Sequence, residues 1–267
     1  MTPKPSETPS DGGKLSILGL IPARAGSNRI ANKNIRFLDG HPMIAYTITS
    51  ALKSGIFSSI IVSTDSQEYA DIARHYGAEV PFLRPEQYAG KLSPDIEWIG
   101  YTLHELEKSG MTYDCFAILR PTSPFRLPET IRRAWKAFTE NPGVDSLRAI
   151  EKCSQHPGKM WVVRGPLMTP ILPFFQNGTP WHSTPYQDLP EVYVQNASLE
   201  IAWTKVVTRD HSIAGEKIMP FISEGYEGFD INITEDWFTA EALIANGVAQ
   251  PVGIELPPYQ NPTESKQ

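Results

Sequence analysis

The stretch Leu15-Ser-Ile-Leu-Gly-Leu-Ile21, followed by Pro22-Ala-Arg-Ala-Gly-Ser-Asn-Arg-Ile-Ala-Asn-Lys-Asn34, decides the fold and points to the site. Its first half is a short, nearly continuous apolar run bounded by turn residues, which is typical of a strand buried in a parallel sheet. Its second half is a polar loop that carries three cations, Arg24, Arg29 and Lys33. Ligands of open α/β sheets bind outside the carboxyl ends of the strands, so we expect this loop to bind the ligand.

The remaining apolar patterns predict strands and helices that alternate along the chain. Strands are expected at residues 59–63, 115–119, 144–150 and 198–203, and helices are expected to begin at Pro42, Gln67, Pro94, Pro128 and Thr234. The first helix should bury Ile44, Ile48, Ala51 and Leu52, and Asp65 and Thr234 should cap the helices that follow them. Alternation of this kind implies βαβ units, so the fold class is α/β, with a Rossmann-like, doubly wound, mostly parallel sheet.

Composition divides the chain into a single domain with two tails. Residues 1–13 are rich in Pro, Ser, Thr and Gly and are expected to form a disordered tail, and residues 251–267 form a polar C-terminal tail. Residues 14–250 form the domain. Within it, residues 155–195 hold many prolines and aromatics and predict an irregular excursion. Such an apolar excursion would cover the substrate or pack against a second subunit, so a homodimer is expected.

Charge and cysteine content exclude several classes of protein. The net charge is −6 and the pI about 5.6, whereas a nucleic-acid-binding protein usually shows a basic face. No apolar run approaches the roughly 20 residues that span a bilayer. Cys115 and Cys153 are the only cysteines and lack metal-type spacing, so we expect a reducing, cytoplasmic compartment.

The loop after the first strand suits a polyphosphate without matching the commonest phosphate-binding motifs. Small residues let backbone N–H groups approach phosphates, and the loop cations would neutralise them. Neither GxxxxGK[ST] nor GxGxxG occurs, which argues against a P-loop kinase and against a dinucleotide-binding enzyme. No HExxH or GxSxG motif occurs either, which argues against a zinc or serine hydrolase.

Five ordered motifs give the chain a specific resemblance. Ile21-Pro-Ala-Arg-Ala-Gly-Ser-Asn-Arg-Ile-Ala-Asn-Lys-Asn-Ile35 resembles the signature loop of CMP-sialic acid synthetases, the acylneuraminate cytidylyltransferases. Further motifs follow in that family's order: Ile61-Val-Ser-Thr-Asp65, Leu83-Arg-Pro85, Leu119-Arg-Pro-Thr-Ser-Pro124 and Phe229-Asp-Ile-Asn232. The resemblance covers about residues 15–247. It implies a nucleotidyltransferase that transfers CMP from CTP to the anomeric hydroxyl of a sialic-acid-like nonulosonic acid, with release of pyrophosphate.

The same resemblance implies a role for each matching residue. The catalytic residues would be Arg24, Lys33 and Asp230. The nucleotide would contact Ala23, Arg24, Ser27, Asn28, Arg29, Lys33, Asn34 and Arg84. The acceptor sugar would contact Arg120, Thr122, Ser123, Lys159, Gln187 and Asn196. The cofactor would be Mg2+, held by Asp230 and Asn232, because hard cations prefer oxygen ligands.

Departures from the family pattern keep other acceptors and a second kind of function open. Similar enzymes often carry Lys at the position of Asn28, Gln at that of Arg120 and Asp at that of Asn232, so the number of metal ions stays open. Tyr186 and Val194 stand where sialic acid enzymes place arginines for the sugar carboxylate, which favours a related sugar such as legionaminic or pseudaminic acid. The alternatives are a cytidylyltransferase for another acidic sugar of the 3-deoxy-octulosonate type, or a non-catalytic nucleotide-binding paralogue. The paralogue is suggested by Asn28, Lys91 and Asn232. The general base is not identified.

Overall fold

The computed structural model describes residues 15–26 and 29–260 of the chain. Its contacts divide the chain into two compact units. The first unit comprises residues 1–149 and 196–267, and the second comprises residues 150–195. Within the described residues, no helix is long and apolar enough to cross a membrane.

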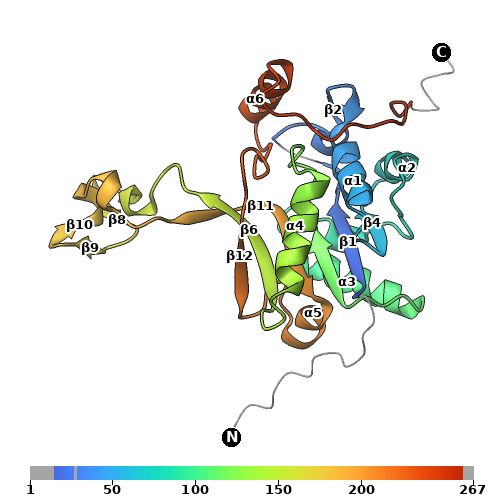
Figure 1. The fold of residues 1–267 in the computed structure, drawn as a ribbon, viewed down its shortest axis with the longest axis horizontal. Helices are drawn as coiled ribbons and strands as arrows, with labels where there is room; N and C mark the ends of the chain where they lie inside the picture. Colours follow the sequence, from blue (N-terminus) through green and yellow to red (C-terminus); the bar gives the residue numbers. More distant parts are fainter. Residues whose placement is uncertain (1–14, 27–28, 261–267) are drawn as a thin grey trace, which may run out of the picture. The chain divides into compact units, whose positions relative to one another are not determined.

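The first unit consists of strands that alternate with helices, as Figure 1 shows. Its main strands are β1 (Ile17–Pro22), β4 (Ser59–Ser63), β5 (Cys115–Ile118), β6 (Ser146–Lys152), β11 (Tyr193–Trp203) and β12 (Ile218–Ile222). A short hairpin, β2 (Phe37–Leu38) and β3 (His41–Pro42), precedes the first helix. The helices are α1 (Met43–Ser54), α2 (Gln67–His75), α3 (Asp95–Lys108), α4 (Pro128–Thr139), α5 (Thr204–Asp210) and α6 (Thr234–Ala245). Single 3-10 turns occur at Lys33–Ile35 and Glu86–Tyr88.

The six main strands form one sheet in the order β12-β6-β11-β5-β1-β4. β1 pairs in parallel with both β4 and β5, with Leu20 opposite Ile61 and Ile118. β11 pairs antiparallel to β5, with Ile201 opposite Ala117. The carboxyl ends of β1, β4 and β5 therefore meet at one edge of the sheet, and the loops that carry Arg24, Asp65 and Arg120 begin there. The α/β, Rossmann-like prediction is confirmed.

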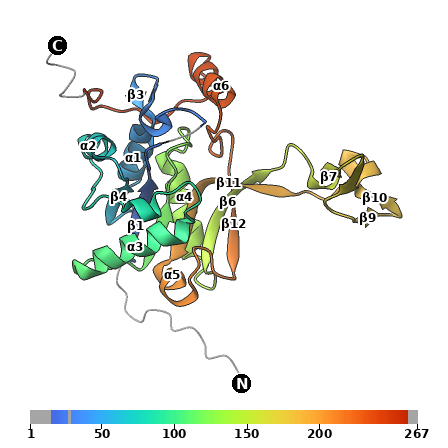
Figure 2. The same ribbon diagram turned by 180° about the vertical axis from the view of Figure 1, so that it is seen from behind.

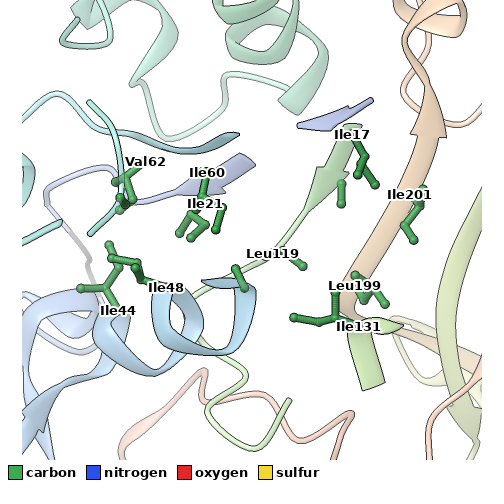
Figure 3. Packing of buried hydrophobic residues seen from close by; sticks show 14 of the residues in the cluster. Ile17, Ile21, Ile44, Ile48, Ile60, Val62, Leu119, Ile131, Leu199 and Ile201 are labelled. Carbon is green, nitrogen blue, oxygen red and sulfur yellow. The ribbon is translucent and has the colours of Figure 1, made fainter. Parts of the chain in front are cut away.

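The central strands are apolar throughout because each face of the sheet is covered by helices. On β1, Ile17 and Ile21 point to one face, while Leu18 and Leu20 point to the other. The first face packs against α1, α2 and α4, and Figure 3 shows isoleucines and leucines of this cluster between the strands and the helices. The second face packs mainly against α3 through Trp98, Ile99, Leu103 and Leu106. α4 stands before the sheet in Figure 1 and α3 in the opposite view of Figure 2.

A third apolar cluster anchors the chain near the carboxyl edge of the sheet. Ile231, Trp237 and Ala240 pack against Met43 and Tyr46 of α1 and against the β2–β3 hairpin. Ile231 is fully buried, so the polar residues on either side of it have a fixed backbone. Burying an isoleucine side chain is worth about 1.5–3 kcal/mol, which is enough to hold such a segment in place.

The second unit is built from short hairpins and single turns. Its strands are β7 (Trp161–Arg164), β8 (Leu167–Pro170), β9 (Phe175–Gln176) and β10 (Thr179–Pro180), and its 3-10 turns are Pro157–Lys159, Trp181–Ser183 and Tyr186–Asp188. β7 pairs antiparallel with β8, and β9 with β10. Much of its apolar surface is open to solvent: Val163, Leu167, Met168, Phe174 and Phe175 are each more than half exposed.

Some local expectations are wrong. Leu52 is 46% exposed and lies off the buried face of α1, because the face that packs on the sheet runs through Ile44, Ile48 and Ala51. Pro42 precedes α1 as its N-cap and does not open it. The strand expected at residues 198–203 begins earlier, at Tyr193, and runs antiparallel to its neighbour β5.

Candidate active site

The loop after β1 is tied to the end of β4 by two backbone donors. Ala23 N–H donates to the carbonyl of Ser63 at 2.9 Å, and Ala25 N–H donates to Asp65 Oδ1 at 2.7 Å. Asp65 is therefore not the cap of α2. That role belongs to Ser66, whose side chain accepts from Tyr69 N–H. Asp65 instead holds the backbone after Arg24, at Ala25, while the carbonyl of Ser63 holds the backbone before it, at Ala23.

The two ends of this loop converge on one place. Asn34 Nδ2 donates to the carbonyl of Arg24 at 3.5 Å, which closes the loop on itself. Lys33 Nζ donates to the carbonyl of Ile231 at 2.6 Å. Burial lowers the pKa of Lys33, with Asp230 and Asp236 acting against it. Arg29 is exposed, and Ala23 is buried in the core. Ser27 and Asn28 lie outside the described residues.

Arg84 is held from two sides beside this loop. Its Nε donates to Ser63 Oγ and its Nη2 to the carbonyl of Ser63, both at 2.9 Å. The guanidinium lies over the ring of Trp98, 4.6 Å from the centroid. Burial lowers the pKa of Arg84 to about 10, although Asp65 and Asp95 act against it. The side chain is therefore fixed in orientation before any ligand arrives.

A chain of ion pairs runs across the other side, at the end of β5. Arg120 Nη2 donates to Asp95 Oδ2 and, at 3.3 Å, to Glu200 Oε1. Glu200 Oε2 lies 2.8 Å from Arg148 Nη1, and Asp95 Oδ1 accepts from Trp98 Nε1 at 2.7 Å. Burial acts to lower the pKa of Arg120, but the hydrogen bond to Asp95 and the two carboxylate charges raise it above its usual value. Asp95 and Glu200 therefore hold Arg120 in its charged form.

Next to Arg120, the turn contacts the segment after β12. The carbonyl of Thr122 accepts from Ile231 N–H at 2.9 Å. Ser123 is 2% exposed, and its hydroxyl has no partner among the described residues. The turn that follows β5 is thus linked by backbone to the residues that flank Asp230.

These elements enclose a cavity of about 200 Å³ at the carboxyl edge of the sheet. It brings together six residues that the sequence predicts for the site: Arg24, Lys33, Asn34, Arg84, Arg120 and Thr122. It is also lined by residues that were not predicted for the site: Pro22, Tyr88, Gly90, Lys91, Ser93, Asp95, Trp98 and Pro121. Five of the lining residues are cationic and one, Asp95, is acidic. The cavity therefore suits a ligand with several negative charges.

Asp230 and Asn232 flank buried Ile231 rather than line this cavity. Asp230 Oδ2 accepts from Asn232 Nδ2 at 2.6 Å, and Asp230 Oδ1 is buried without a partner among the described residues. An unpartnered carboxylate oxygen is the group that a hard cation would satisfy, so this pair fits a divalent metal. Over residues 15–26 and 29–260, no cluster of three or more acidic, His or Cys ligands occurs.

The helix after this pair is capped by a residue other than the expected one. Thr234 is the first residue of α6, and Ile233 is the N-cap residue. Asp236 Oδ2 accepts from the N–H groups of Asn232 and Ile233, at 2.7 and 2.9 Å. The prediction that Thr234 caps α6 is wrong, because the Asp236 carboxylate reaches back to these donors.

The remaining acceptor-side candidates lie in both units. Lys159 is in the second unit, where its ammonium donates to the carbonyls of His182 and Thr184 and lies over the ring of Tyr186. Gln187 is exposed in the same unit. Asn196 belongs to the first unit, where its Nδ2 donates to Ser223 Oγ at 2.9 Å and its Oδ1 accepts from Ser198 N–H.

Comparison with known proteins gives a consistent result. Residues 18–147 match the family model described as cytidylyltransferase. The chain is 36% identical over 239 residues to the CMP-N,N'-diacetyllegionaminic acid synthase of Legionella pneumophila, across 86% of this chain and 97% of that protein. It is 36% identical over 124 residues to a pseudaminic acid cytidylyltransferase of Campylobacter jejuni, across 46% of this chain and 53% of that protein.

One solved structure shares the fold at low sequence identity. It is a CMP:2-keto-3-deoxy-manno-octonic acid synthetase complexed with CTP, with a TM-score of 0.63 and 13% identity. The match covers 87% of this chain and 99% of that chain. At this identity the likeness is one of fold alone.

Proposed function

The chain belongs to the cytidylyltransferase family, and from that premise we propose that it transfers CMP from CTP to the anomeric hydroxyl of a sialic-acid-like nonulosonic acid. The observation that carries this proposal is the cavity at the carboxyl edge of the sheet, with five cations and one carboxylate around it. A triphosphate and an acid sugar together bring several negative charges, and fixed cations stabilise them.

In the reaction, the anomeric oxygen of the sugar attacks the α-phosphorus of CTP. The new bond joins that oxygen to the α-phosphorus, the bond from the α-phosphorus to the bridging oxygen breaks, and pyrophosphate leaves. The hydroxyl proton passes to solvent or to a base. Arg24, Lys33 and Asn34 would hold the triphosphate, with Ala23, Ser27, Asn28 and Arg29 as further contacts of the loop. Because phosphoryl-type transfer depends on positioning and electrostatics, these groups would stabilise the charge that develops on the leaving group.

We assign the divalent cation to Asp230 and Asn232. Support comes from the buried Oδ1 of Asp230, which has no partner within the described residues, and from the oxygen chemistry of both side chains. The cation we propose is Mg2+, which supplies charge neutralisation at the phosphates when bound. Lys33, bonded to the carbonyl of Ile231 between the two ligands, would place a second positive charge at the same phosphates.

On the acceptor side we propose Arg120, Thr122, Ser123 and Asn196 from the first unit. Lys159 and Gln187 stay predictions from the family resemblance. The acceptor we favour is a legionaminic-acid-like sugar, because the relative that matches along 97% of its length is named for that product. We also propose that a second copy of this chain covers the exposed apolar side chains of the second unit, which light scattering of the purified protein would test.

A pyrophosphate-release screen tests the function. The purified protein would be incubated with Mg2+, each of CTP, UTP, ATP and GTP, and each of several acids: legionaminic, pseudaminic and N-acetylneuraminic acids and 3-deoxy-octulosonate. We expect release with CTP and a nonulosonic acid, and a CMP-sugar product by mass. Release with 3-deoxy-octulosonate alone would favour the other acidic sugar. CTP binding without release under any condition would favour a non-catalytic paralogue.

A further inference from the structure

Arg126 is an arginine buried in the first unit, and no carboxylate of residues 15–26 or 29–260 pairs with it. It is 1% exposed and lies at the end of the turn that leads from β5 to α4. All hydrogen bonds that the described residues give its guanidinium go to neutral oxygens, and its Nε has no partner among them. Burial lowers the pKa of Arg126 to about 9, with the charge of Asp230 acting against it.

A charge in such surroundings is costly. Taking a guanidinium out of water is strongly unfavourable even after the protein relaxes, and an unpaired polar N–H adds to that cost. An apolar side chain could fill the same space without this penalty. We therefore expect that this position needs a property specific to a guanidinium, which is that its planar fork can donate hydrogen bonds to several fixed oxygens at once.

The fork of Arg126 joins three segments that are distant in sequence. Nη1 donates to the carbonyl of Ser198 on β11, and Nη2 donates to Thr47 Oγ1 on α1 at 2.9 Å. Both nitrogens also donate to the carbonyl of Arg120 at 3.2 Å. Thr47 Oγ1 donates to that same carbonyl at 3.4 Å. Three donors from two residues, Arg126 and Thr47, thus hold the backbone at Arg120.

From this carbonyl, a short route of hydrogen bonds reaches the other side of the cavity. Two residues along, the carbonyl of Thr122 accepts from Ile231 N–H at 2.9 Å, and the carbonyl of Ile231 accepts from Lys33 Nζ at 2.6 Å. On β11, Ser198 N–H donates to Asn196 Oδ1 at 3.2 Å. The backbone held by Arg126 therefore lies between the acceptor-side candidates and the segment that carries Asp230.

We propose that Arg126 is a positioning residue for the transfer reaction, which sets the placement of the acceptor-side turn relative to Lys33 and Asp230. It does not line the cavity, so it acts through the residues that it holds. This inference rests on the proposed function. It predicts that loss of Arg126 impairs use of the acid more than binding of CTP. The loop backbone next to Arg24 is held by Asp65, and the side chain of Arg84 is held by Ser63, so neither depends on Arg126.

The test compares four variants of the full chain by steady-state pyrophosphate release. Arg126→Met removes the fork, and Arg126→Lys replaces it with a single ammonium group that keeps the charge. We expect kcat/KM for the acid to fall about 100-fold and about tenfold, respectively, since small misplacements of reacting groups cost this much. KM for CTP should stay within about twofold in both. Thr47→Val keeps Arg126 but cuts the links through the hydroxyl. It should lower kcat/KM for the acid about two- to fivefold, the scale of one hydrogen bond.

The matched control is Arg132→Met. Arg132 lies on α4, also donates to two backbone carbonyls, of Lys53 and Ser54, and is 44% exposed outside the cavity. Its kinetic constants should equal those of the wild type. Thermal unfolding of every variant separates folding from function, and Thr47→Val decides the matter if Arg126 variants fail to fold.

A rise in KM for CTP as large as the loss in kcat/KM for the acid, or wild-type kinetics in Thr47→Val and in every Arg126 variant that folds, would overturn the inference and leave the proposed function standing. A wild-type chain that releases no pyrophosphate with any acid would overturn both.

Discussion

The ammonium of Lys33 donates a 2.6 Å hydrogen bond to the backbone carbonyl of Ile231, across 198 positions of sequence. Ile231 is fully buried in the cluster that packs α6 against α1. Because that carbonyl is fixed, it holds a loop cation beside the segment that carries Asp230. Two features that the sequence presents at opposite ends of the chain therefore meet at one site.

Replacing Lys33 by Ala should lower turnover at least about 100-fold, since a lost charge-stabilising donor costs about 2–4 kcal/mol in the transition state. Arg24→Ala should have an effect of the same size. Initial rates of pyrophosphate release with saturating CTP measure it. Lys53→Ala is the control, because Lys53 is exposed and bonds Glu255 and Gly253 far along the chain. Near-normal turnover in either loop variant would contradict the phosphate role.

Asp65→Ala should raise KM for CTP about fivefold, the effect of about 1 kcal/mol, because Ala25 N–H loses its acceptor and the loop loosens. Asp65→Asn should raise KM for CTP less than Asp65→Ala does, since the amide oxygen of Asn can still accept the hydrogen bond from Ala25 N–H. Ser66→Ala is the matched control on the next residue: it removes the cap of α2 and should lower stability by about 1 kcal/mol with KM unchanged. The prediction fails if Asp65→Ala and Ser66→Ala have the same kinetic effect.

The central strands could be predicted from sequence because they are buried on both faces. β4 matches the predicted range at both ends, and the strand predicted at 115–119 is one residue shorter, at Cys115–Ile118. The direction of β11 could not be predicted, because an apolar run has the same pattern in a parallel and an antiparallel neighbour. The short hairpins of the second unit were missed because strands of two to four residues are too short to show a clear periodicity.

The residues of the site also fall into those that the sequence could predict and those that it could not. Arg24 and Lys33 were predicted to lie at the site because cations that follow a buried strand face the ligand edge of a sheet. Asp95 and Glu200 were not, because their role depends on contacts with Arg120 across 25 and 80 positions. Asp95 lies at the start of a helix, where an acidic residue is expected for the helix dipole alone.

Asp95→Asn should lower the free energy of unfolding at neutral pH by about 1–3 kcal/mol, because it removes the negative charge that accepts a hydrogen bond from Arg120. Burial acts to raise the pKa of Asp95, but the hydrogen bond and charge of Arg120 lower it below its usual value. Stability from this pair is thus fully present above the unfolded pKa near 4 and is lost as pH falls through the folded value.

Urea unfolding at pH 7 and at pH 3 would measure this difference, which should shrink at the lower pH. Glu105→Gln serves as the control on the same helix, since Glu105 pairs with Lys108 at the surface and such pairs contribute about 0–1 kcal/mol. A stability difference between wild type and Asp95→Asn that does not change with pH would rule out the ionic origin.

Asp230→Ala should remove the increase in turnover that Mg2+ causes in the wild type. Asn232→Asp should instead lower the Mg2+ concentration needed for half-maximal turnover. The second change adds a carboxylate next to Asp230, whose Oδ2 contacts residue 232 and whose Oδ1 has no partner in the described part of the chain. Hard cations bind more tightly as ligand charge increases. Turnover as a function of Mg2+, after treatment with a chelator, measures both. Asp236→Asn is the control for the capping carboxylate of α6. Unchanged Mg2+ curves in both ligand variants would place the metal elsewhere.

The pH dependence of turnover should report the state of Lys33, because only the ammonium form neutralises a phosphate. Burial lowers the pKa of Lys33 below its usual 10.5, so turnover should fall as pH rises through that lowered value. Stability should change in the opposite sense: between the folded and unfolded values the unfolded chain binds the extra proton, so the contribution of Lys33 rises with pH. Lys33→Arg, which stays charged throughout, should retain activity at higher pH than the wild type. If the wild type and Lys33→Arg lose turnover over the same pH range, a group other than Lys33 controls the fall in turnover at high pH.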